Sequence, residues 1–233
     1  MDKYSILKQY YGHGAFRAGQ EALIDAILSG RDALCVMPTG GGKSLCYQIP
    51  ALLLPGITLV VSPLISLMKD QVAALKSAGV PAAYINSSLT GEQIRTVYTR
   101  TRKGAYKLIY VAPERLETNS FLSLMQEMDV SFLAVDEAHC ISQWGQDFRP
   151  SYLGIVDFIN ALPRRPIVAA YTATATKQVQ SDILRLLQLQ SPYRIVTGFD
   201  RPNLYFDVRR PKNKFSALAA LIDERRDRSG IVY

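Results

Sequence analysis

The chain has 233 residues, of which 48% are hydrophobic and 20% are charged, a balance typical of a folded globular protein rather than a disordered one. No stretch approaches the roughly 20 apolar residues that a membrane-spanning helix needs, and the first residues, Met1 to Tyr4, lack the pattern of a secretory signal. The formal net charge is +7, which is typical of a protein with a polyanionic partner such as nucleic acid; the alternative is a generally basic surface, and charge alone does not decide between them.

Short apolar runs alternate with amphipathic segments along most of the chain. This alternation is typical of an α/β domain in which a mainly parallel sheet carries helices on both faces. Residues that carry chemistry are then expected at the carboxyl ends of the strands. The predicted strands span residues 32–37, 57–61, 82–85, 107–111, 131–135, 167–171 and 193–197, and helical patterns span 21–28, 64–78 and 90–103.

The first predicted strand runs into a glycine-rich loop, Pro38-Thr39-Gly40-Gly41-Gly42-Lys43-Ser44. Without Cβ atoms, the glycines allow the backbone to wrap a phosphate chain, and the helix that starts near Lys43 points its positive end there. Lys43 offers a charge to the β- and γ-phosphates, and the Ser44 hydroxyl is a ligand for Mg²⁺. The loop predicts a nucleoside triphosphate site, although Met37 stands where the general pattern has glycine. The alternative is a plain glycine-rich turn.

A second motif, Asp136-Glu137-Ala138-His139, follows the predicted strand 131–135. Adjacent carboxylates at a strand end repel each other unless a cation or a proton lies between them. Asp136 is therefore a candidate Mg²⁺ ligand, and Glu137 is a candidate for orienting and deprotonating the attacking water. His139 is a candidate for coupling this site to a neighbouring loop. With Lys43, these three residues form the candidate catalytic set; the alternative is an acidic helix N-terminus.

These motifs and their surroundings resemble the RecQ DNA helicases of superfamily 2. The segment from Cys140 to Pro150 is the specific part, because other DEAH helicases lack it. The resemblance implies a RecA-like P-loop NTPase fold, ATP and Mg²⁺ as cofactors, and ATP-dependent 3′-to-5′ DNA unwinding in repair and recombination. The residues that carry it are Phe16 to Gln20, Met37 to Ser44, Ser62 to Gln71, Val111 to Leu116, Asp136 to Gly145, Asp147 to Pro150, Tyr171 to Thr176 and Phe199 to Leu204.

The resemblance also implies an adenine site near the N-terminus. Gln20 would read adenine, since a glutamine amide can pair with the N6 and N7 edge of the base. Arg17 would support the nucleotide, and His13 stands where the family places an aromatic residue that stacks on the base. Without the resemblance, Gln20 is interpreted as a polar residue that opens the helix 21–28.

An aromatic loop follows the acidic motif. Its aromatic side chains, Trp144, Phe148 and Tyr152, offer faces to unpaired bases, and Arg149 offers a charge to phosphate. Because the loop is continuous with the Mg²⁺ site, we expect it to report DNA binding to hydrolysis. The alternative is a small aromatic core cluster. The family commonly has His where this chain has Gln146.

Further DNA contacts are implied by the resemblance alone. Ser62, Lys69 and Arg115 would hold the backbone of one DNA strand, and Thr172 and Thr174 would link the ATP state to the grip on DNA. Each has an ordinary alternative: a helix N-terminus, a surface loop or a helix cap.

The sequence changes character near residue 207. The segment 209–214 is basic and contains a proline, as in a linker, and the segment 215–228 has a helical pattern. Residues 230–233 then begin another apolar strand. By resemblance, we expect residues 1–207 to form the first RecA-like motor domain, and residues 208–233 to form a linker and the opening elements of a truncated second one, the rest of which is missing from this chain.

The leading interpretation is therefore the motor of an ATP-dependent DNA helicase. Its expected partners are single-stranded and partly duplex DNA, with no membrane, and this chain alone should bind Mg²⁺-ATP but hydrolyse it poorly. One alternative is a nucleic-acid-binding module that uses ATP only as a conformational ligand. Another is an unrelated P-loop ATPase such as a transporter subunit, whose Leu-Ser-Gly-Gly-Gln signature the sequence lacks.

The expected location is intracellular. The three cysteines show no metal-ligand spacing and are interpreted as reduced thiols. We expect the cytoplasm, at the nucleoid, in a bacterium, or the nucleus in a eukaryote.

Overall fold

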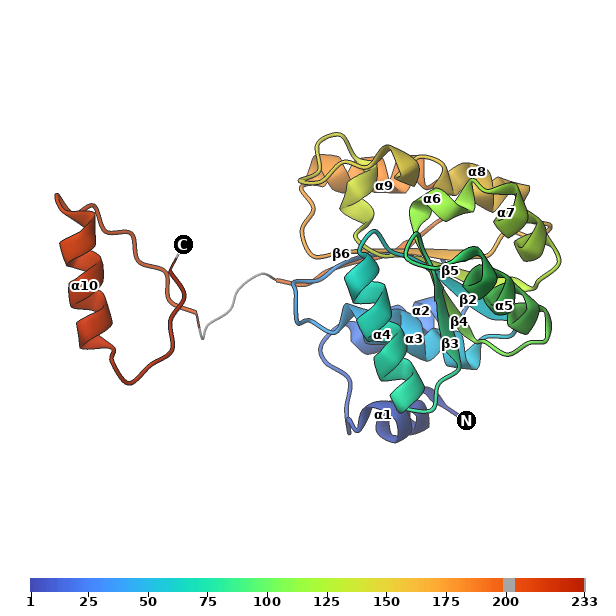
Figure 1. Cartoon of the computed structure of the whole chain (residues 1–233), viewed down its shortest axis with the longest axis horizontal. Helices are drawn as coiled ribbons and strands as arrows, with labels where there is room; N and C mark the ends of the chain where they lie inside the picture. Colours follow the sequence, from blue (N-terminus) through green and yellow to red (C-terminus); the bar gives the residue numbers. More distant parts are fainter. Residues whose placement is uncertain (199–203, 233) are drawn as a thin grey trace. The chain divides into compact units, whose positions relative to one another are not determined.

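A seven-stranded sheet forms the centre of the larger part of the molecule in the computed structural model, which describes residues 1–198 and 204–232 (Figure 1). The strand order is β3-β4-β2-β5-β6-β1-β7, and neighbouring strands pair in parallel. The predicted strands are confirmed, each boundary lying within one residue of its expected position. The strands are β1 (Ala33–Val36), β2 (Ile57–Val61), β3 (Ala82–Ile85), β4 (Leu108–Val111), β5 (Val130–Val135), β6 (Ile167–Thr172) and β7 (Tyr193–Val196).

Helices cover both faces of the sheet, as the alternation of strands and helices predicts. Side chains alternate between the faces along each strand, so Leu59 packs into one hydrophobic cluster and Val60 into the other. Figure 1 shows the two helical layers on opposite sides of the strands. One layer holds α2 (Gln20–Leu28), α3 (Lys43–Leu53) and α4 (Ile65–Ser77); the other holds α5 (Gly91–Arg102), α6 (Pro113–Leu116), α7 (Asn119–Gln126), α8 (Ile155–Ala161) and α9 (Lys177–Leu186).

The helix α1 (Lys3–Tyr11) lies outside these layers and packs through Ile6 and Leu7 against α2 and α3. It ends at Gly12, whose φ of 69° lies in the left-handed region that glycine adopts without strain. The chain then runs from α1 to α2 through the segment that holds His13 and Arg17. The packing of α1 therefore fixes the position at which this segment begins.

A buried carboxylate fastens the start of β1 to its surroundings. Asp32 is 3% exposed and accepts hydrogen bonds from the backbone amides of Val168 (2.9 Å) and Gln190 (2.7 Å). The Arg165 guanidinium also donates to both carboxylate oxygens of Asp32, at 3.1 Å to Oδ1 and 2.6 Å to Oδ2. Because every carboxylate oxygen has donors, the charge is satisfied, and the starts of β1 and β6 are held in register with the loop before β7.

The chain divides by its internal contacts into two compact units, Met1–Phe199 and Asp200–Tyr233. In the second unit, α10 (Lys214–Glu224) confirms the predicted helix but ends four residues earlier than expected, and none of its residues is buried. The motif residues 199–203 lie outside the described residues.

The strand expected at 230–233 is not found. Residues 230–232 form no strand, and Ile231 and Val232 are 80% and 61% exposed; Tyr233 lies outside the described residues. An apolar run becomes a strand only where a partner strand receives its backbone hydrogen bonds, and here none does.

No helix within residues 1–198 and 204–232 combines the length and the apolar character needed to cross a membrane.

We predict that Arg165→Ala lowers the free energy of unfolding by about 3 kcal/mol, because it leaves the buried Asp32 carboxylate without its counter-charge. The measurement is urea unfolding followed by circular dichroism. The adjacent Arg164→Ala is the matched control, since Arg164 pairs with Asp129 at the surface, where side-chain exposures are 69% and 51%. It should leave the unfolding free energy nearly unchanged. Equal decreases of the unfolding free energy in Arg165→Ala and Arg164→Ala would contradict the proposed role of Asp32.

Candidate active site

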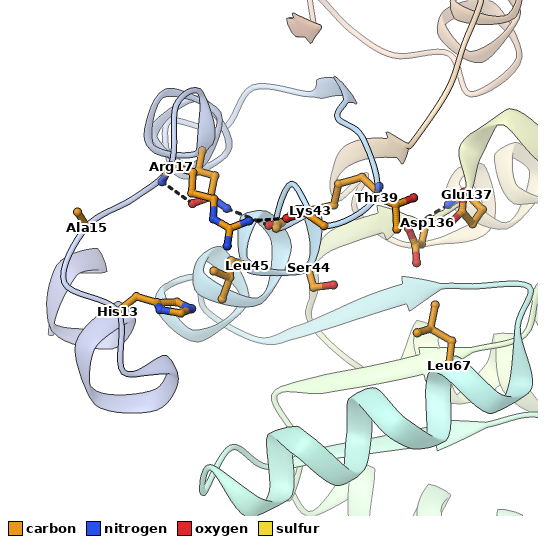
Figure 2. A pocket seen from close by; sticks show the side chains of 13 residues that line it. His13, Ala15, Arg17, Thr39, Lys43, Ser44, Leu45, Leu67, Asp136 and Glu137 are labelled. Atoms are coloured by element: carbon orange, nitrogen blue, oxygen red, sulfur yellow. Dashed lines mark hydrogen bonds between the residues drawn. The ribbon is translucent and has the colours of Figure 1, made fainter. Parts of the chain in front are cut away.

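The glycine-rich loop leaves β1 and enters α3 beside the labelled side chains of the site (Figure 2). Gly40 and Gly42 have φ values of 79° and 82°, which other residues adopt only with strain. Gly42 is the N-cap of α3 and supplies no side-chain hydrogen bond, so the first amides of the helix can face an anion. The Lys43 Nζ donates to the Met37 carbonyl at 2.9 Å and so lies folded over the loop.

Gln20 fastens this loop to the start of α2. Its side chain is buried; Nε2 donates to the carbonyls of Gly41 and Gly42, both at 3.2 Å, and Oε1 accepts from the Arg17 amide at 2.8 Å. A Cβ at position 42 would overlap Gln20 Nε2, so the contact requires glycine there. The Arg17 guanidinium also donates to the Gly40 carbonyl. Gln20 thus shapes the loop, while adenine recognition by this residue stays a prediction.

A cavity of about 400 Å³ lies between this loop and the end of β5 (Figure 2). It collects most of the residues predicted for nucleotide binding and catalysis, although Pro38, Gly41 and His139 do not line it. Three lining residues, Ala15, Leu45 and Leu67, were not predicted, because short apolar side chains outside a motif carry no chemical signal. The predicted residues that line it are His13, Arg17, Gln20, Thr39, Gly40, Gly42, Lys43, Ser44, Asp136 and Glu137.

Asp136 is held rigidly at the end of β5. Its amide donates to the Val61 carbonyl at 2.9 Å, and its carbonyl accepts from the Tyr152 hydroxyl at 2.8 Å. Burial, followed by the neighbouring charge of Glu137, raises the pKa of Asp136 to about 6. Tyr152 is fully buried, so it cannot offer its ring to a base, and the prediction that it contacts DNA is wrong.

The residues in the cavity fit a magnesium ion by their chemistry. The Ser44 hydroxyl and the Asp136 carboxylate are hard oxygen donors, and a buried carboxylate with a raised pKa is one that a cation would stabilise. Within the described parts of the chain, no group of three or more His, Cys, Asp or Glu side chains is gathered for a metal. A cation here would depend on few protein ligands, which is usual for Mg²⁺ bound together with phosphates.

His139 joins the acidic motif to the end of β6. Its Nδ1 lies 2.9 Å from Thr172 Oγ1 and 3.3 Å from Glu137 Oε2. Thr172 Oγ1 donates its own proton to the Thr174 carbonyl at 3.0 Å, so both neighbours of Nδ1 are acceptors and Nδ1 carries the proton. Contacts with Cys140 and with Glu137 raise the pKa of His139, and the hydrogen bond from His139 lowers that of Glu137.

The aromatic loop presents its tryptophan to solvent. Trp144 is 75% exposed, so the alternative of a small aromatic core cluster is wrong for this residue, and Phe148 is half-buried. The Arg149 guanidinium pairs with Asp147 at 2.8 Å and donates to the Pro63 carbonyl at 3.3 Å. The loop that follows β5 therefore contacts the loop that follows β2.

The residues predicted to hold the DNA backbone differ in accessibility. Lys69 is exposed on α4, and Arg115 is half-buried, with its guanidinium 3.4 Å from the Asn86 carbonyl. Ser62 is 1% exposed, and its hydroxyl has no hydrogen-bond partner in the part of the chain that the structure describes. Thr174 is exposed, whereas Thr172 is fully buried against His139.

Comparison with known proteins gives a consistent result. The DEAD/DEAH box helicase model matches residues 17–182. The ATP-dependent DNA helicases RecQ of Bacillus subtilis and Haemophilus influenzae are each 48% identical to this chain over 98% of its length. This chain spans only 39% and 37% of those relatives. The crystal structure of the Pyrococcus furiosus Hef helicase domain superposes with a TM-score of 0.60 at 21% identity, covering 77% of this chain and 38% of that one, which shows a shared RecA-like fold.

The raised pKa of Asp136 predicts that this carboxylate destabilises the free protein at neutral and alkaline pH. Below the ordinary pKa of 3.8, Asp136 is protonated in both the folded and the unfolded chain and the penalty disappears; the penalty grows as the pH rises from there to about 6 and is fully present above that value. Asp136→Asn removes the charge and should raise the free energy of unfolding by about 1–3 kcal/mol at pH 8.

The measurement is denaturant unfolding of both proteins at pH 4 and pH 8 in the presence of a chelator. The two proteins should converge at pH 4. Asp157→Asn, a change of the same kind on α8, is the control. A stabilisation that is the same at both pH values would show that the charge of Asp136 is not its cause.

Proposed function

The chain belongs to the DEAD/DEAH box helicase family and, within it, to the RecQ helicases, and from this premise we propose that it is the ATP-binding motor domain of an ATP-dependent DNA helicase. One observation supports the proposal most directly. The loop after β1, with Lys43 and Ser44, and the carboxylates after β5, Asp136 and Glu137, face the same cavity (Figure 2). A phosphate chain placed there meets loop amides, a lysine and two carboxylates at once.

Lys43 and the loop amides would hold the phosphates. The Lys43 ammonium leaves its internal partner, the Met37 carbonyl, for the more highly charged phosphate oxygens. Ser44 and Asp136 would hold Mg²⁺, which neutralises charge on the phosphates when bound. Glu137, whose pKa His139 lowers, stays ionised and would orient the attacking water and take its proton.

The base of the nucleotide would lie toward α2. His13 lines the cavity on its exposed side, and its imidazole offers a face for stacking on adenine. Arg17 and Gln20 already contact the phosphate loop, so adenine pairing by Gln20 requires one of its amide hydrogens to exchange a loop carbonyl for the base. Nucleotide binding and loop shape are thereby linked through one side chain.

DNA would bind along the edge formed by the loops after β2, β4, β5 and β6. Lys69, Arg115 and Thr174 are the polar residues available for phosphates, and Ser62 and Thr172 would act by shaping the loops from within. The exposed Trp144 would stack on an unpaired base. The net charge of +7 supports single-stranded or partly duplex DNA as the partner. The likeness to RecQ helicases is the basis for proposing 3′-to-5′ unwinding in repair and recombination.

The larger protein would contain a second motor domain. We propose that residues 1–207 form the first motor domain and that residues 208–233 are the linker and the beginning of the second. We further propose the cytoplasm, at the nucleoid, as the location in a bacterium, or the nucleus in a eukaryote.

We predict that the 233-residue chain binds Mg²⁺-ATP but turns it over slowly. In superfamily 2 motors, the second motor domain supplies an arginine that stabilises the charge developing on the γ-phosphate. Such an arginine is worth about 10³–10⁵ in rate. Steady-state hydrolysis with single-stranded DNA, compared with a version that carries both motor domains, measures the difference. Similar hydrolysis rates in the two proteins would contradict the proposed contribution of the second motor domain.

Lys43→Ala should abolish nucleotide binding, because it removes the charge that faces the β- and γ-phosphates. Titration of a fluorescent ATP analogue into the chain measures this. Lys76→Ala makes the same change at an exposed position of α4 that does not line the cavity, and it should bind as the unmodified chain does. Undiminished binding by Lys43→Ala would mean that the cavity is not the nucleotide site.

Trp144→Ala should lower DNA-stimulated hydrolysis far more than basal hydrolysis in the protein with both motor domains. The reason is that the exposed ring is the proposed contact through which the loop senses DNA. Trp144→Phe keeps an aromatic face and should retain much of the stimulation. Parallel losses of basal and stimulated rates would instead identify a structural tryptophan.

A further inference from the structure

The aromatic loop begins with a buried hydrogen bond to α9. Ser142 is fully buried, and its hydroxyl donates to Asp182 Oδ2 at 2.7 Å. The Trp144 amide donates to the same hydroxyl oxygen at 3.2 Å. The Asp182 carboxylate, 40 positions from Ser142 in the sequence, is therefore connected to the backbone of Trp144 by two hydrogen bonds that share the Ser142 hydroxyl.

The direction of these hydrogen bonds follows from the chemistry of the groups. An ionised carboxylate only accepts, so the Ser142 proton points at Asp182, and the lone pairs of its oxygen are left for the Trp144 amide. The Ser142 hydroxyl, and then Arg185, lower the pKa of Asp182, so it acts as a charged acceptor at neutral pH. A hydrogen bond to a charged acceptor is stronger than one between neutral groups.

Further contacts fix the rest of the loop. The Gly145 amide donates to the Ser142 carbonyl at 2.9 Å, and a Cβ on Gly145 would overlap the His139 carbonyl. The Arg149 amide donates to the Cys140 carbonyl at 2.9 Å. With both ends held, the loop presents Trp144 to solvent from a short and closely constrained stretch of backbone.

We propose that Asp182 is a positioning residue for Trp144, acting through the Ser142 hydroxyl to fix the backbone from which the exposed ring projects and so to restrict the motion of the ring. Because such a ring is already ordered in the free protein, it loses less conformational entropy when it stacks against a base. The orientation of the ring is a property of the free protein. Only its consequence for DNA affinity rests on the proposed function.

The same helix also follows the segment that contacts the acidic motif. α9 begins directly after the Thr176 cap, a few residues beyond Thr172, whose hydroxyl accepts from His139. Asp182 therefore ties the Trp144 loop to the structural element next to the candidate catalytic residues. A change in the position of α9 would be transmitted to the backbone of Trp144 through the two hydrogen bonds of the Ser142 hydroxyl.

Trp144 is the only tryptophan in the chain, so fluorescence reports on this loop alone. We expect Asp182→Ala and Ser142→Ala each to increase local motion of the ring, seen in time-resolved anisotropy of the free protein. Asp182→Asn keeps an oxygen acceptor for Ser142 and should restore most of the order. The double variant should be no more mobile than either single one, because both changes remove the same connection.

Arg185→Ala is the matched control, because it removes the other partner of Asp182 (3.0 Å) and leaves Ser142 in place. It should leave the anisotropy unchanged. Unfolding curves confirm that each variant is folded at the temperature of measurement. Unchanged ring motion in both alanine variants overturns the inference, and so does an equal effect of Arg185→Ala.

Affinity for an oligothymidine, measured by anisotropy of a dye on the DNA, then tests the consequence. Asp182→Ala should weaken binding about three- to tenfold, the effect of losing one hydrogen bond, and Asp182→Asn should weaken it less. Trp144→Ala removes the ring itself and so tests the DNA contact of Trp144 separately from the positioning role of Asp182. If Asp182→Ala frees the ring but neither variant weakens DNA binding, the positioning role stands and the DNA contact of Trp144 fails.

Discussion

Parallel pairing of β5, β6 and β1 is the constraint on which the site depends. Because β6 lies between the other two and all three run in the same direction, the loops that follow β1 and β5 emerge on either side of the end of β6. The cavity forms between these two loops. Thr172 at the end of β6 contacts His139 of the acidic motif. An antiparallel strand at any of these positions would place one motif at the opposite edge of the sheet.

Three charged side chains meet at the cavity in the free protein. Asp136 is a buried carboxylate with a raised pKa, the Lys43 ammonium donates to the Met37 carbonyl, and Glu137 adopts a φ of 47°, which is unfavourable for a residue with a Cβ atom. All three line the cavity, so its charges are in place without a ligand.

Connections between the motifs are made by single side chains. Gln20 joins the base side of the cavity to the phosphate loop, His139 joins the acidic motif to β6, and Ser142 joins the tryptophan loop to α9. Each is a polar side chain that bonds backbone or side-chain groups of another element. These hydrogen bonds connect elements around the cavity directly, in addition to the packing between them.

The strands and the two phosphate-site motifs are readable from the sequence, because apolar periodicity and glycine chemistry are local properties. How exposed a side chain is, and which group it bonds, depend instead on parts of the chain that are distant in the sequence. The sequence groups Trp144 with Tyr152, yet one is 75% exposed and the other fully buried. Gln20 is interpreted from the sequence as an adenine reader or as a polar residue that opens a helix, whereas in the structure both ends of its amide bond other parts of the protein. The apolar run at 230–232 looks like a strand but forms none, since the pattern cannot supply a neighbour. The His139–Thr172 and Ser142–Asp182 bonds join residues 33 and 40 positions apart, and only the packing of α9 and β6 against the acidic motif brings them within hydrogen-bond distance.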